Sequence, residues 1–149
     1  MVRKIREFAT SIVPLAFRFS SSLTHTAAWD DDAEDESDLE NHIMGTEALE
    51  RLADTLGERL FMEAYRGLLE QGLKAAEWTT RYCAWTGLAQ VVGACPDAIS
   101  AMAVGLVGLA LYTLNDANSH PRLKWAVAHA LGLARVFLSL SVTLSSCLN

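Results

Sequence analysis

The residues best suited to chemistry form a run of carboxylates in the first third of the chain. Between Asp30 and Glu40 the sequence places eight acidic side chains and no basic one, although the rest of the chain is slightly basic. A single ion pair at about 4 Å in water is worth only about 1 kcal/mol. Many carboxylates together create a negative field that speeds association with Lys/Arg-rich segments and repels nucleic acid. We therefore expect this run to bind basic proteins and not DNA or RNA.

Trp29 stands at the edge of the acidic run. Its ring is suited to anchoring the run by packing, or to covering an arginine of a partner. The predicted partner site in this part of the chain comprises Trp29, Asp30, Asp31, Asp32, Glu34, Asp35, Glu36 and Asp38. The alternative is that the run is a solubilising linker that binds nothing.

Other chemistries lack the residue spacing that they need. The acidic run has neither the D-x-D-x-D-G pattern nor the glycine turn of a calcium loop. The three cysteines include no C-x-x-C pair, which favours reduced thiols over a disulfide framework or a zinc site. No phosphate loop or nucleophile elbow occurs. The histidines show no i, i+4 pair and lie in separate segments, at His25, His42, His120 and His129. We expect no enzyme activity, no cofactor and no metal site.

The elements that carry these residues are predicted to be helices. The apolar stretches are rich in Ala, Leu, Glu and Arg, only three prolines occur, and few stretches alternate with period 2. Turn signals include Gly57, expected as a left-handed residue after a helix, and Pro96 and Pro121, expected in first turns. The spacing predicts helices over residues 45–56, 60–73, 78–92, 96–114 and 121–134.

Two further features concern apolar faces. An N-terminal amphipathic helix is predicted from residues at three- and four-residue steps, with Pro14 as a kink, and its apolar stripe is Ile5, Phe8, Ile12, Leu15 and Phe19. Residues 98–114 carry no formal charge and are close to the length of a membrane span, and the Leu/Ser-rich residues 136–148 look similar. We favour a helix buried between two neighbours for residues 98–114, because burial on all sides demands the same composition; a membrane is the alternative.

The helices repeat along the chain. At an offset of about 36 residues, Ala48, Leu52, Ala53, Leu56 and Gly57 fall on Ala84, Leu88, Ala89, Val92 and Gly93, and other positions match at about 43. These periods are typical of HEAT or armadillo units, which are helical hairpins that bury their apolar faces by stacking. We predict an all-α, HEAT-type α-solenoid segment of about three antiparallel helical hairpins; an ordinary helical bundle is the alternative.

Several runs of the sequence resemble importin-beta (karyopherin-beta) HEAT helices, nearest the branch that imports ribosomal proteins and core histones. Two helix openings resemble the family's "DW-x-x-R-x-A" and "HPRVR-x-A" runs, and the acidic run with its tryptophan resembles the loop before an "ALDRLA" helix. The matching stretches, in family order, are residues 29–38, 48–53, 77–84, 90–95, 120–127 and 131–134. Residues beyond Ala134 depart from the family pattern.

The resemblance implies a segment of a nuclear import receptor, found in cytoplasm and nucleus. It implies basic protein cargo such as histones or ribosomal proteins, and regulation of the full array by a Ran-type GTPase. It also implies that the second helix of each hairpin lines a concave face, where Glu63 and Glu70 would contact a partner. The alternatives are a small helical adaptor without transport activity and a membrane-associated helical protein.

The predicted layout is a single HEAT-repeat domain over residues 1–149. Uncapped end repeats are expected to self-associate through apolar surface. The predicted parts are a first helix (1–28), an acidic loop (29–44), hairpins at 45–76 and 77–116, and a partial hairpin with an off-pattern tail (117–149).

Overall fold

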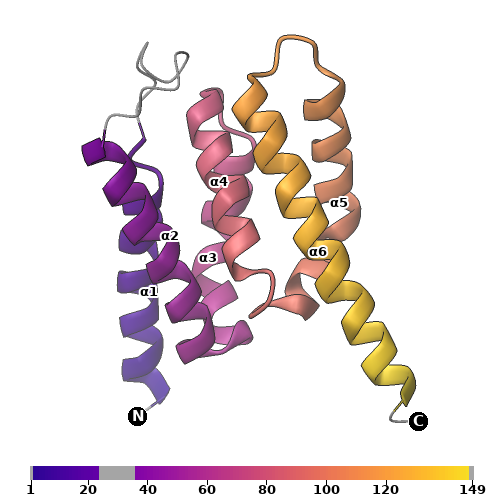
Figure 1. Ribbon diagram of the computed structural model, residues 1–149. Coiled ribbons are helices and arrows are strands. Elements are labelled where there is room, and N and C mark those ends of the chain that lie inside the picture. Colours follow the sequence, from indigo (N-terminus) through magenta and orange to yellow (C-terminus); the bar gives the residue numbers. More distant parts are fainter. Residues whose placement is uncertain (1, 24–35, 148–149) are drawn as a thin grey trace.

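The computed structural model describes residues 2–23 and 36–147, with side chains described for residues 3–23 and 40–135. Within these residues all regular structure is helical (Figure 1). This confirms the predicted all-α class. The helices are α1 (Val2–Ser20), α2 (Glu36–Leu56), α3 (Glu58–Leu73), α4 (Trp78–Val91), α5 (Pro96–Asn115) and α6 (Pro121–Cys147).

The helices form two layers that are stacked hairpin on hairpin. Helices α2, α4 and α6 pack side by side in one layer, and α1, α3 and α5 follow one another in the second (Figure 1). Helix α5 packs chiefly on α6 of the first layer, and it touches α3, its neighbour in the second layer, only lightly. This is the arrangement of a solenoid, in which each hairpin buries its apolar face on its neighbours.

Large side chains of α3 and α4 fill the centre of the stack. Trp85, Tyr65 and Phe61 are the largest fully buried side chains of the described residues. The rings of Phe61 and Tyr65 lie 4.9 Å apart between centroids. Burying an apolar side chain of this kind contributes about 1.5–3 kcal/mol, so these positions hold the hairpins together.

Two helices are longer than the sequence pattern predicts. Helix α2 begins at Glu36 and not at Gly45, so the end of the acidic run lies on a helix and not in a loop. Gly45 lies inside α2 because α2 crosses α1 closely there: a Cβ at this position would overlap the backbone nitrogen of Ser20. Helix α6 continues to Cys147 instead of ending near Ala134, since no glycine or proline interrupts the Leu/Ser-rich stretch after Gly132.

The predicted apolar stripe of α1 is wrong for most of its members. Ile12 packs against the core, but the other four residues are exposed: Ile5, Phe8, Leu15 and Phe19. The buried side is made of small residues, which allow α2 to approach closely and exclude large side chains from the contact. These residues are Ala9, Val13, Ala16 and Ser20.

Helix α5 is not buried on all sides, which corrects our explanation of its composition. One face packs inward through Ile99, Leu106, Ala110 and Thr113. The opposite face is apolar and open to solvent, and Val104 is 91% exposed. Among the described residues, α5 is the one helix long and apolar enough to cross a membrane, and 22% of its most apolar window is buried.

Candidate protein-binding groove

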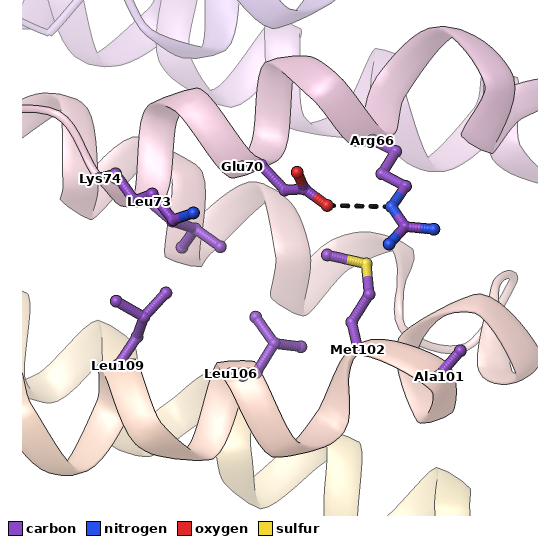
Figure 2. A pocket seen from close by; sticks show the side chains of 9 residues that line it. Arg66, Glu70, Leu73, Lys74, Ala101, Met102, Leu106 and Leu109 are labelled. Atoms are coloured by element: carbon purple, nitrogen blue, oxygen red, sulfur yellow. Dashed lines mark hydrogen bonds and ion pairs between the residues drawn. The ribbon is translucent and has the colours of Figure 1, made fainter.

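A groove of about 300 Å³ lies between α3 and α5. Figure 2 shows the two helices facing each other across it, with Arg66 opposite Met102 and Leu73 opposite Leu109. Both helices belong to the layer formed by α1, α3 and α5. Its lining consists of Arg66, Glu70, Leu73, Lys74, Ala101, Met102, Gly105, Leu106 and Leu109.

The first turns of α3 and α5 are tied together. Oε1 of Glu58 accepts a hydrogen bond from the backbone N–H of Ala98 at 2.6 Å. Cys95 precedes α5 and provides no side-chain cap, whereas Pro96 at the start has no N–H to satisfy. The carboxylate of Glu58 therefore caps α5 from another helix, and it fixes how far α5 stands from α3.

The floor of the groove is apolar. Leu73 and Leu106 are buried, and Met102 and Leu109 are half-buried against the core. Space is left open by Gly105, where an added Cβ would meet nothing within 4 Å. Flexible Met and branched Leu side chains beside open space are suited to receiving apolar side chains of a partner.

The charges at the rim come from α3 and from Lys74, the residue that follows it. Nε of Arg66 pairs with Oε1 of Glu70 at 2.9 Å. Lys74 has no ion pair among the residues whose side chains are described. Helix α5 has no charged residue between Asp97 and its end at Asn115. The groove thus carries one ion pair and one uncompensated positive charge.

Two of the predicted partner-binding residues, Glu63 and Glu70, have described side chains. Glu63 pairs with Arg6, at 3.0 Å between Nε and Oε2, and with Arg59 at 3.9 Å. Glu70 pairs with Arg66, as above. Both carboxylates are therefore engaged within the chain. The other predicted residues lie outside the residues with described side chains, although the backbone of Glu36 and Asp38 belongs to α2: Trp29, Asp30, Asp31, Asp32, Glu34, Asp35, Glu36 and Asp38.

The sequence did not point to the apolar lining of the groove as a site. Met102, Leu106 and Leu109 recur at steps of four and three residues, which is the spacing of one helix face. This spacing did not identify a binding face because nearly every residue of α5 is apolar, so the helix has no polar face from which an apolar face could be distinguished.

Trp78 and Arg81, near the start of α4, contact the turns that precede α4 and α6. The rings of Trp78 and His120 stack at 3.8 Å between centroids. Nη1 of Arg81 donates to the carbonyl oxygens of Ala75 and Ala76, at 2.7 and 2.8 Å. These side chains hold the α3–α4 turn against the α5–α6 turn, so the neighbouring hairpins keep a fixed register.

Two cysteines and one histidine of the described residues are buried in the core. Burial raises the pKa of the Cys83 and Cys95 thiols to about 12, so both are protonated at neutral pH. Burial lowers the pKa of His42, and its hydrogen bond with the Ser20 carbonyl opposes this shift. No group of three or more metal-ligating side chains occurs among the described residues.

Comparison with known proteins agrees with this architecture. A family profile described as "Importin repeat" matches residues 1–63, which include α1, α2 and the acidic run. Residues 1–63 are thus similar to an importin repeat. The resemblance of the chain to importin-beta HEAT repeats is thereby confirmed.

The fold extends beyond the matched importin repeat. The crystal structure of Kap121p superposes with a TM-score of 0.74 at 21% sequence identity, over 90% of this chain and 13% of that chain. At this identity the likeness concerns the fold, which is a segment of a karyopherin HEAT solenoid. The chain is thus a helical scaffold whose fold resembles a segment of a karyopherin.

Proposed function

We propose that the chain is a cargo-binding segment of a nuclear transport receptor and binds basic proteins without catalysis. The observation that carries this proposal is that the acidic run from Asp30 to Glu40 falls inside the importin repeat of residues 1–63. The karyopherin fold over 90% of the chain supports the same class of function. Lys/Arg-rich segments, such as those of histones and ribosomal proteins, are the proposed cargo.

Electrostatics accounts for the proposed preference. No single carboxylate of the run would hold a partner, but charges within about 8 Å of one another add their fields at physiological salt. Such a field raises the rate of association more than it lengthens the lifetime of the complex. Glu63 and Glu70 already form ion pairs within the chain, so they contribute less to binding a basic partner. The proposal therefore depends mainly on the acidic run and Trp29.

Transport itself requires the context of a whole receptor. The chain spans 13% of the length of Kap121p. We propose that regulation by a Ran-type GTPase acts through a complete array of HEAT hairpins. Movement between cytoplasm and nucleus belongs to the same proposal and depends on the same context.

A pull-down with immobilised Lys/Arg-rich histone tails tests the role of the acidic run. The variant D30N/D31N/D32N removes three of its charges, and the matched control E50Q/D54N/E77Q removes three exposed carboxylates elsewhere. Retention of the chain should be strong at about 50 mM salt and weak at about 300 mM. The first variant should lose retention and the control should keep it; equal retention of the two variants would refute the role of the acidic run.

Helix α5 favours a second candidate, association with a membrane. Its composition and length suit a bilayer, and its outer face, including Val104, is exposed. Flotation with phosphatidylcholine vesicles decides between the candidates. A receptor segment stays in the dense fractions, whereas a membrane-associated chain floats with the vesicles.

A further inference from the structure

We infer that the groove between α3 and α5 binds an apolar peptide segment that carries a carboxylate beside Lys74. This partner differs in chemistry from the basic cargo proposed for the acidic run. It also uses different residues, so the two interactions can be tested separately.

The groove lies between neighbouring helices of one layer. It is bounded by α3 and α5, so hairpins stacked next to α1 or α6 would not come between these two helices. Its volume of about 300 Å³ lies at the lower end of the range of roughly 300–1,000 Å³ for binding pockets. This size suits a few side chains of a peptide better than a folded surface.

The lining selects for apolar side chains. Leu73 and Leu106 form a buried floor, and Met102 and Leu109 flank it from α5. Gly105 is exposed beside this floor and has no neighbour within 4 Å of an added Cβ. An amphipathic or extended segment can therefore place large apolar side chains beside Gly105 without displacing the chain's own atoms.

The charge pattern selects for an acidic group. Glu70 is already paired with Arg66 across 2.9 Å, as Figure 2 shows. Lys74 lies at the end of the groove beside Leu73 and has no ion pair among the described side chains. A basic segment would meet this ammonium group and no unpaired carboxylate of the lining. A carboxylate of the partner would instead complete an ion pair with Lys74.

Selection from a displayed library of random peptides of about twelve residues, with the folded chain as target, tests the inference. Peptides that bind the wild-type chain are then measured by fluorescence anisotropy on three variants. G105Q fills the groove, while G108Q places the same side chain one turn away and outside the lining. Both changes replace an exposed helical glycine with a better helix former, so neither is expected to disturb folding. K74E reverses the charge at the end of the groove.

The inference expects peptides with two or more large apolar residues and at least one Asp or Glu. Their affinity should fall at least about tenfold on G105Q, stay unchanged on G108Q, and fall about three- to tenfold on K74E. Replacing the peptide's acidic residue with Lys should restore binding to K74E. The inference is overturned if the selected peptides bind G105Q as well as wild type, or if those that depend on Gly105 are rich in Lys and Arg. It is also overturned if the chain self-associates and G105Q abolishes that association, because the groove would then hold a second copy.

Discussion

The Glu58 carboxylate of α3 caps α5, through a 2.6 Å hydrogen bond from the Ala98 N–H. The two residues are forty positions apart in the sequence and belong to different hairpins. An acidic side chain at a helix N-terminus is stabilised both by the hydrogen bond and by the helix dipole. This one contact therefore couples the first turn of α5 to the first turn of α3.

Removing the cap should loosen α5. We expect E58A to lower the free energy of unfolding by about 1 kcal/mol, since an N-cap is worth about 0.5–2 kcal/mol. Urea denaturation measures this loss, and hydrogen exchange should speed up at the amides of the first turn of α5. The control E50A removes an exposed carboxylate from α2. Equal losses in the two variants would show that Glu58 has no special role.

The contact between α3 and α4 leaves no room beside the Tyr65 hydroxyl. A Cβ at Gly87 would lie 2.9 Å from Oη of Tyr65, which is fully buried. We expect G87A to cost about 1–3 kcal/mol of stability through overpacking. In a Y65F background the same change should cost less than about 1 kcal/mol, because the clashing oxygen is gone. A double-mutant cycle by urea denaturation measures this coupling, and additive effects of the two changes would contradict it.

Burial of His42 makes stability depend on pH. Its pKa is lowered in the folded chain, chiefly by burial, while Nδ1 donates a hydrogen bond to the Ser20 carbonyl. As pH falls below about 6.5, the unfolded chain takes up a proton on this imidazole more readily than the folded chain, so stability falls. Above about pH 6.5 the imidazole is neutral in both the folded and the unfolded chain, so no stability is lost through His42.

Urea denaturation at about pH 7.5 and about pH 5.5 measures this effect. H42Q should reduce the loss of stability between the two conditions. The control H129Q alters an exposed histidine on α6 and should leave the loss as in wild type. A loss of the same size in H42Q and wild type would mean that other groups cause it.

The exposed apolar side chains of α1 and α2 should promote self-association. They include Phe8 at 54% and Phe19 at 48% exposure, both on α1. We expect F8Q/F19Q to shift sedimentation velocity towards monomer without lowering stability, since neither ring is buried. The control W125Q removes an exposed ring from α6. Association that persists in F8Q/F19Q would place the contact elsewhere.

Local signals in the sequence predicted where several helices begin and end. Gly57 adopts a φ of 76°, the left-handed conformation expected between two helices. Pro96 and Pro121 begin α5 and α6, because proline fits a first helical turn. The repeat of small and apolar residues predicted the stacking of the hairpins. These features depend on residues close together in the sequence, so the sequence alone was sufficient.

Features that depend on tertiary contacts could not be predicted in this way. Gly45 resembles a helix start, but it is the point where α2 crosses the backbone of α1 at Ser20. That close approach decides which face of α1 is buried and leaves Phe8 outside. The groove lies between two helices that the Glu58–Ala98 contact joins, and no spacing within one helix contains that information.

The central claim is that the acidic run binds basic cargo by electrostatic attraction. Its most direct test is the salt dependence of the affinity of the chain for a Lys/Arg-rich histone tail, measured by isothermal titration calorimetry. We predict that Kd rises steeply with salt for the wild-type chain and for E50Q/D54N/E77Q. For D30N/D31N/D32N we predict a weaker affinity and a flatter dependence on salt. Identical affinities and slopes for all three proteins would contradict the claim.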